Sequence, residues 1–162
     1  MSPANLLAEN QAFADWLKQQ DPVAIDQQVQ ALEQRISPEI DCLACGNCCR
    51  SLMIVVEEAE ADALSHHLNT TRAAFDAQYL EKGSSGRMVM NQMPCAFLAG
   101  NACTIYPERF SGCREFPALH LPHFNKRLFT TFMHYERCPI IREVVEALKK
   151  ESGFLPHPHA QD

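Results

Sequence analysis

Half of the cysteines in this chain lie within one short segment. Residues 41–50 read Asp-Cys-Leu-Ala-Cys-Gly-Asn-Cys-Cys-Arg, so that four of the eight cysteines fall inside eight consecutive positions. The other four follow at widely separated positions, namely Cys95, Cys103, Cys113 and Cys138. A chain that concentrates half of its thiols in one segment and then returns with four more is most simply interpreted as one that builds a metal site.

Composition restricts the class of protein and its compartment. The chain has 162 residues, which fits one domain with an appendage, and its net charge of -6 argues against non-specific binding of nucleic acid. It has no apolar run of roughly 18 residues, the length that spans a bilayer, and its first ten residues lack the features of a secretion signal. These features predict a cytoplasmic protein that binds neither nucleic acid nor membrane. In that reducing compartment metal binding is favoured over four disulfides.

The cysteine-rich segment begins with a Cys-x-x-Cys-Gly motif formed by Cys42, Cys45 and Gly46. Two intervening residues allow both sulfurs to face one ion, and the glycine accepts a positive φ angle and leaves its N–H available to a thiolate. The same spacing is repeated from Cys45 to Cys48, which supplies three ligands from seven residues. Three such thiolates and one distant cysteine would complete either tetrahedral zinc or a [4Fe–4S] cluster.

The sequence leaves the pairing of the cysteines open. Cys138 is followed by Pro139, and in bacterial ferredoxins one cysteine ligand is likewise followed by proline. This similarity indicates one way to divide the eight cysteines between two metal centres. In that division one centre is held by Cys42, Cys45, Cys48 and Cys138, and a second by Cys49, Cys95, Cys103 and Cys113. Because Cys48 and Cys49 are adjacent, they would equally suit a single polynuclear cluster.

Arginines accompany the cysteines along the sequence. Arg50, Arg114 and Arg137 each adjoin a cysteine, and Arg109 lies between two of them. A guanidinium close to a thiol lowers its pKa and offsets the charge of about -2 that a four-thiolate site carries. The arrangement favours thiolate ligands without distinguishing zinc from iron.

Four motifs of the sequence carry a family resemblance. They are Cys42-x-x-Cys45-x-x-Cys48-Cys49, Cys95-Ala-Phe-Leu98, Cys103-Thr-Ile-Tyr106-Pro-Glu-Arg109 and Cys113-Arg-Glu-Phe-Pro117. With them, residues 41–139 resemble the bacterial CxxCxxCC (YkgJ-type) family, a zinc- or iron-chelating domain to which the flagellin lysine N-methylase is distantly related. The resemblance implies that all eight cysteines are metal ligands, and it implies no agreed reaction. The family commonly has Arg-Pro after Ile-Tyr, so only Arg109 is carried over from that motif.

The rest of the sequence predicts a small α+β fold in three parts. Residues 1–40 form two amphipathic helices, over 5–19 and 22–36, that pack on the core. Residues 41–150 form the metal-stapled cysteine-cluster domain with short strands and irregular loops. Its strands are expected at 52–56, 87–92 and 128–135, its helices at 57–68, 70–80 and 139–150, and its loops over 94–122. Residues 151–162 form a mobile tail.

These observations favour a metal-binding protein whose eight cysteines coordinate zinc or an iron–sulfur centre. Such a protein would act as a scaffold, a sensor or an electron-transfer module. The alternative is a protein-modifying enzyme, related to the N-methylase and acting with a partner. The chain has no glycine-rich phosphate loop and no nucleophile elbow, and no catalytic residue is assigned. The N-terminal helices, with Trp16, are the expected place for a protein partner. Weaker candidate ligands are His66, His67, His120, His123 and His134.

Overall fold

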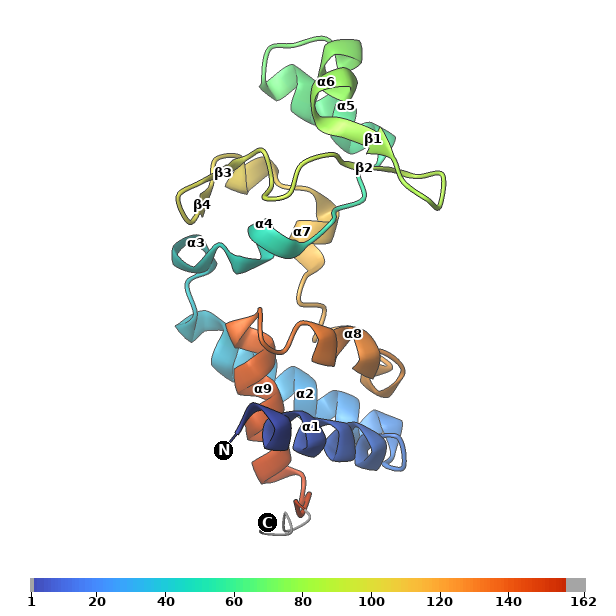
Figure 1. The fold of residues 1–162 in the computed structure, drawn as a ribbon, viewed down its shortest axis with the longest axis vertical. Coiled ribbons are helices and arrows are strands. Elements are labelled where there is room, and N and C mark those ends of the chain that lie inside the picture. The colour runs from blue at the N-terminus through green and yellow to red at the C-terminus, as the bar shows by residue number, and fades with distance from the viewer. Residues whose placement is uncertain (1, 157–162) are drawn as a thin grey trace. The chain divides into compact units, whose positions relative to one another are not determined.

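The computed structural model describes residues 2–156, which form two compact units (Figure 1). The first, the helical unit, consists of the described residues of Met1–Ile40 and Pro117–Asp162. The second, the cysteine unit, is Asp41–Phe116. The chain therefore changes unit after Ile40 and again after Phe116, whereas the division based on sequence keeps residues 41–150 together.

Two helices open the helical unit, α1 (Pro3–Leu17) and α2 (Pro22–Ile36), and a 3₁₀ turn, η1 (Ser37–Glu39), follows them. Each helix begins with proline after a capping residue. The side chains of Ser2 and Asp21 accept backbone N–H groups of the first turn at 3.3 and 2.8 Å. The predicted pair of N-terminal helices is confirmed, and the proline and cap explain where each one starts.

Helix α9 (Pro139–Glu151) packs along α2 within the helical unit. The predicted helix is confirmed, and its apolar face is buried: Ile140, Ile141, Val144, Val145 and Leu148. Beyond it, the ring of Phe154 is buried and lies 4.8 Å from that of Phe13. The first part of the predicted tail therefore belongs to the fold. Residues 157–162, with His157 and His159, lie outside the described residues.

The strand predicted over 128–135 is wrong, because residues 128–133 form a helix and a turn follows them. Helix α8 (Leu128–Met133) follows the 3₁₀ turn η3 (Phe124–Lys126). The Phe and Thr content favours a strand, but residues two apart in a strand share a face, and here Phe129 is 83% exposed while Thr131 is buried. The Thr131 hydroxyl donates to the carbonyl of Arg127 at 3.0 Å, a bond to residue i−4 that helical geometry permits.

Helices and a hairpin make up one part of the cysteine unit. The elements follow one another along the chain as α5 (Glu58–His67), α6 (Arg72–Tyr79), β1 (Leu80–Lys82) and β2 (Met88–Met90). A capping box of Glu57 and Glu60 opens α5, and the Thr71 hydroxyl caps α6 at 3.1 Å. Both predicted helices and the strand over 87–92 are confirmed, and β1 pairs antiparallel with β2.

The strand predicted over 52–56 reduces to a single bridge between Val55 and Val89. Two hydrogen bonds flank it, from Val56 N to the Met88 carbonyl at 3.0 Å and from Met90 N to the Ile54 carbonyl at 2.9 Å. The backbone N–H of Leu52 instead donates to the preceding helical turn. Only the last residues of the apolar run are therefore left to pair with β2.

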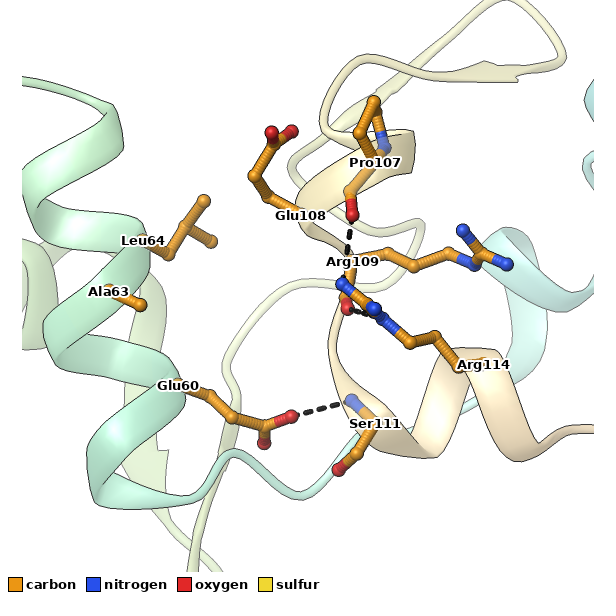
Figure 2. A pocket seen from close by; sticks show the side chains of 8 residues that line it. All are labelled: Glu60, Ala63, Leu64, Pro107, Glu108, Arg109, Ser111 and Arg114. Carbon is orange, nitrogen blue, oxygen red and sulfur yellow. Dashed lines mark hydrogen bonds between the residues drawn. The ribbon is translucent and has the colours of Figure 1, made fainter.

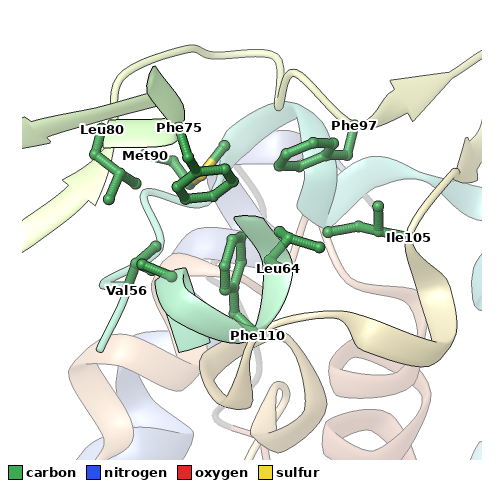
Figure 3. Close-up of a cluster of buried hydrophobic side chains, with 9 residues drawn as sticks. Val56, Leu64, Phe75, Leu80, Met90, Phe97, Ile105 and Phe110 are labelled. Carbon is green, nitrogen blue, oxygen red and sulfur yellow. The ribbon is translucent and has the colours of Figure 1, made fainter. Parts of the chain in front are cut away.

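The region expected to be loops holds several short elements. They are β3 (Leu98–Ala99), β4 (Ala102–Cys103), the 3₁₀ turn η2 (Tyr106–Glu108) and α7 (Ser111–Glu115). Phe97, Ile105 and Phe110 from this region pack with side chains of the helices and hairpin (Figure 3). The resulting buried cluster, called here the cysteine-unit core, consists of Val56, Ala61, Leu64, Phe75, Leu80, Met90, Phe97, Ile105 and Phe110.

Helices with a few short strands in two-stranded sheets make this an α+β fold, as predicted. In the part of the chain that the structure describes, no helix has the length and apolar character needed to cross a membrane.

Candidate metal centre

The cysteine-rich segment folds as two short helical turns joined by one glycine. Helix α3 (Cys42–Cys45) ends and α4 (Asn47–Ser51) begins at Gly46, whose φ of 64° and ψ of 6° are left-handed. The predicted positive φ is thus confirmed. The N–H of Gly46, which the sequence analysis expected to be available to a thiolate, instead donates to the carbonyl of Cys42 at 3.1 Å and closes the first turn. The glycine therefore lets the chain reverse between the second and third cysteines.

Separate elements supply three further cysteines to the same unit. The N–H of Cys95 donates to the carbonyl of Cys49 at 2.8 Å, which ties this loop directly to the cysteine-rich segment. Cys103 ends β4, and Cys113 lies in α7. All three pack against the cysteine-unit core. Seven of the eight predicted ligands therefore lie in one compact unit.

The thiols of the cysteine unit affect one another's ionisation. Burial, and then the charges of Cys48 and Cys45, raise the pKa of Cys42. Burial, and then the charge of Cys48 and a hydrogen bond with it, raise the pKa of Cys49 to about 12. A cation bound beside Cys42 and Cys49 would lower these two raised pKa values and favour their thiolate forms.

The same effect extends to the distant cysteines. Burial, and then the charges of Cys95, Cys48 and Cys103, raise the pKa of Cys113 to about 12. Burial is also the largest cause of the raised pKa of Cys95, to which Cys103 and Cys48 contribute. The charge of Cys48 thus contributes to the raised pKa values of thiols in its own segment and of Cys95 and Cys113, and the charge of Cys103 contributes to those of Cys49, Cys95 and Cys113.

Coordination would require the thiol side chains to turn. As they stand, no three His, Cys, Asp or Glu side chains among residues 2–156 are arranged so that they could hold a metal ion. The backbone, however, already collects seven of the cysteines in one unit. Rotation about a Cα–Cβ bond moves a sulfur without moving the backbone. The donor set itself fits zinc or iron, because soft thiolates are ligands of both.

Cys138 lies in the other unit. It is the N-cap residue of α9 in the helical unit, and it is 8% exposed. Its place among the ligands stays a prediction, and so does the division of the eight cysteines into two centres.

The candidate histidines are divided between the units. His120, His123 and His134 belong to the helical unit, where His120 Nδ1 lies 3.9 Å from a carboxylate oxygen of Glu33. In the cysteine unit, both remaining histidines are in the last turn of α5, and His67 Nε2 lies 3.8 Å from a carboxylate oxygen of Glu108. Their role as ligands stays a prediction.

Among the arginines, Arg109 acts electrostatically on the thiols. Its charge opposes the rise in the pKa of Cys42 and of Cys113. Its guanidinium carbon lies 3.9 Å from the centre of the Tyr106 ring, and its Nη1 donates to the carbonyl of Tyr106 at 2.7 Å. This aromatic face and carbonyl hold the charge in place, as the sequence predicts for an arginine between two cysteines.

The side chains of Arg50 and Arg114 bind backbone carbonyls. Arg114 donates to the carbonyls of Arg109 and Pro107, both at 2.8 Å, and so fixes the turn before α7. Arg50 donates to the carbonyl of Gly100 at 2.8 Å and to the side chain of Asn101. Asn101 is a contact that the sequence analysis missed, although Gly-Asn between two short apolar runs is a recognised hairpin signal.

A pocket of about 400 Å³ lies between α5 and the segment from η2 to α7 (Figure 2). Glu60 of α5 crosses to the other wall, where its carboxylate accepts the N–H of Ser111 at 2.5 Å. Burial would raise the pKa of Glu60, but hydrogen bonds from Ser111 and Glu57 outweigh it and hold this pKa below its ordinary value. The eight residues that line the pocket include no cysteine. The pocket is therefore distinct from the predicted thiol ligands.

Comparison with known families shows to which protein family the cysteine motifs belong. Residues 41–141 match the family CxxCxxCC, described as "Putative zinc- or iron-chelating domain". The chain belongs to the CxxCxxCC family. No curated protein and no solved structure matches the chain. The resemblance carried by the cysteine motifs is thus confirmed, and the chain has the metal-binding character of a zinc- or iron-chelating domain.

Metal uptake by the CxxCxxCC domain is expected to release protons. The thiols of Cys49 and Cys113 have pKa values raised to about 12, so they are protonated at neutral pH in the metal-free protein. Binding of one zinc by four thiolates would displace about four protons, and metal affinity should fall as the pH falls. Calorimetry in buffers of different ionisation enthalpy measures this number. Release of fewer than about one proton per metal would contradict thiolate coordination.

Proposed function

We propose that the CxxCxxCC domain of this chain binds zinc through thiolates and uses the metal as a structural centre of the cysteine unit. The observation that carries the proposal is that seven cysteines from four separate segments lie in one compact unit. The helices and strands in these segments, namely α3, α4, β3, β4 and α7, are only two to five residues long. Helices and hairpins of this length are not stable alone. Metal–sulfur bonds would supply the connections that the backbone lacks.

Closed coordination suits a structural site better than a catalytic one. Structural zinc takes four Cys or His ligands, whereas catalytic zinc keeps one position for water and commonly recruits His or Glu. Here the ligands proposed within the cysteine unit are all thiols. The chain would then act as a scaffold whose folded surface depends on bound metal, in the cytoplasm, where thiols stay reduced.

An iron–sulfur centre is the second candidate, because the same thiols suit it. Adjacent Cys48 and Cys49 and the Cys138-Pro139 pair favour this candidate. An iron–sulfur centre would make the domain an electron carrier or a sensor. The enzymatic alternative, a relative of the lysine N-methylase, stays a prediction because no curated protein matches the chain.

One preparation distinguishes the two metals. We would purify the protein without oxygen, record its visible spectrum, and count zinc, iron and acid-labile sulfide per chain. The structural proposal expects a colourless protein with zinc and no sulfide. A brown protein with absorption near about 400 nm and stoichiometric sulfide would replace zinc by an iron–sulfur centre, and a protein without either metal would overturn the proposal.

Cys138 is proposed as the eighth ligand, because the family match extends through it to residue 141. Cys138→Ser is expected to weaken metal binding in a competition with a chelator. Serine is a good N-cap residue, so the substitution removes the soft donor while it preserves the start of α9. If the variant retains the metal content and affinity of the natural protein, Cys138 is not a ligand.

Docking of a protein partner on the N-terminal helices also remains a proposal. Leu7 of α1 and Val23 of α2 are 72% and 63% exposed, which favours it. Trp16 does not add support, because its ring stacks on Phe13 at 5.8 Å and contacts Phe154 at 5.8 Å.

A further inference from the structure

Arg50 joins two parts of the cysteine unit that are far apart in sequence. It lies in the last turn of α4, directly after Cys49. Its Nη2 donates to the carbonyl of Gly100 at 2.8 Å and to the side-chain oxygen of Asn101. Its Nη1 lies 3.3 Å from the carbonyl of Cys45 as a third, longer donor contact. One guanidinium therefore holds the cysteine-rich segment against the turn of the β3–β4 hairpin.

Gly46 makes this close approach feasible. It is buried, and a Cβ atom at this position would lie 2.6 Å from the carbonyl oxygen of Asn101 and 2.8 Å from Nη1 of Arg50. Contacts shorter than about 3 Å do not occur for real Cβ atoms, and the left-handed φ of Gly46 also disfavours a side chain. The glycine is thus required for the backbone of the hairpin turn to lie directly against the cysteine-rich segment.

The β3–β4 hairpin links the Arg50 contact to Cys103. Gly100 and Asn101 are the two residues between β3 and β4, whose register pairs Ala99 with Ala102 and Leu98 with Cys103. Cys103 therefore follows the contact point by two residues. On the other side, Cys49 immediately precedes Arg50. The contact therefore joins the segments of two cysteines that are separated by more than fifty residues of chain.

We propose that Arg50, Asn101 and Gly46 form a clamp that fixes the positions of Cys49 and Cys103 in the metal-bound cysteine unit. Arg50 acts here as a positioning residue through its planar, forked donors, and not merely as a positive charge near thiols. Residues that orient metal ligands from outside the coordination shell strengthen metal binding. The clamp rests on the proposed function of the cysteine unit. Two of its residues, Arg50 and Asn101, lie outside the cysteine motifs.

The decisive variant is Arg50→Lys, which keeps the positive charge but loses the planar, forked N–H donors of the guanidinium. We expect its affinity for zinc, measured by competition with a chelator, to fall by about 10-fold to 100-fold, as for other residues that orient metal ligands. The Co²⁺-substituted variant should also show altered ligand-field absorption. Asn101→Asp retains the side-chain acceptor and should bind nearly as tightly as the natural protein, whereas Asn101→Ala should show a partial loss.

Arg87→Lys is the matched control, because Arg87 is an exposed arginine of the same unit that pairs with Glu57 through its guanidinium. It should leave zinc affinity unchanged.

Two failures are distinguishable in this experiment. If the natural protein binds no metal, the proposed function fails. If the natural protein binds zinc and both Arg50→Lys and Asn101→Ala match its affinity and Co²⁺ spectrum, the clamp is wrong while the metal centre stands. Should Arg50→Lys not fold, Asn101→Ala alone decides, and unchanged affinity in that variant overturns the clamp.

Discussion

Removal of metal with a chelator is expected to unfold the cysteine-bearing parts of the cysteine unit and to leave the helical unit folded. The segments concerned are residues 41–53 and 94–116, which hold one-turn helices and two-residue strands. Structural zinc contributes an apparent binding free energy of about 10–16 kcal/mol to small thiolate domains, and this is lost with the metal. Amide hydrogen exchange with and without chelator, read residue by residue, measures the expected loss of protection.

The helical unit supplies an internal control for this prediction. Helices α1, α2 and α9 have their own buried side chains, including Phe13, Val29 and Ile141, so their amides should stay protected. Added Zn²⁺ should restore protection of the cysteine segments, whereas Mg²⁺ should not, because Mg²⁺ prefers oxygen ligands. Identical exchange of both regions before and after metal removal would show that the metal is not structural.

Lys149→Met is expected to destabilise the helical unit strongly. Lys149 is 6% exposed, and its Nζ donates to Glu9 at 2.8 Å, Asn10 at 2.6 Å and Glu146 at 2.7 Å. Tyr135 donates to the same oxygen of Glu146 at 2.8 Å. Removal of the ammonium leaves the buried Glu9 without a cation and leaves the half-buried Glu146 with Tyr135. Breaking a buried ion pair by removal of one partner typically costs about 3–5 kcal/mol. Chemical denaturation of the full chain measures the change in the free energy of unfolding.

The pH dependence of this effect gives an additional test. Burial would raise the pKa of Glu146, but hydrogen bonds from Lys149 and Tyr135 outweigh it and hold that pKa below its ordinary value. A carboxyl group with a lowered pKa in the folded state stabilises at neutral pH, and this stabilisation is lost as the pH falls through the folded pKa. The difference between Lys149→Met and the natural protein should therefore shrink in acid.

Lys150→Met serves as the matched control. Lys150 is the next residue of α9 and is exposed, so its substitution should change stability by no more than about 0.5 kcal/mol. Equal stability of the Lys149 and Lys150 variants at neutral pH would refute the importance of the buried network.

The sequence predicted those parts of the fold that carry local signals. Asp21-Pro22, the glutamates at 57, 58 and 60 and the proline at 139 each mark a helix start, and all three helices are observed. The positive φ of Gly46 also followed from its place after Cys45. The family of the candidate metal centre was recognised from the sequence, because the motifs around the cysteines recur in a fixed order in that family.

Long-range packing could not be predicted from local composition. Residues 128–135 have strand-forming side chains, but tertiary burial of Thr131 selects a helix. The grouping of α9 with α2 depends on contacts between residues about a hundred positions apart. The contact of Arg50 with Asn101 likewise depends on a fold that the sequence pattern does not encode, so only the adjacency of Arg50 to Cys49 was visible.

X-ray absorption spectroscopy at the metal edge tests the central claim most directly, because it counts the atoms bound to the metal. For the zinc-loaded protein we predict a first shell of four sulfur atoms at about 2.3 Å and no nitrogen or oxygen. A first shell dominated by nitrogen or oxygen atoms at about 2.0–2.1 Å would contradict coordination by the cysteines.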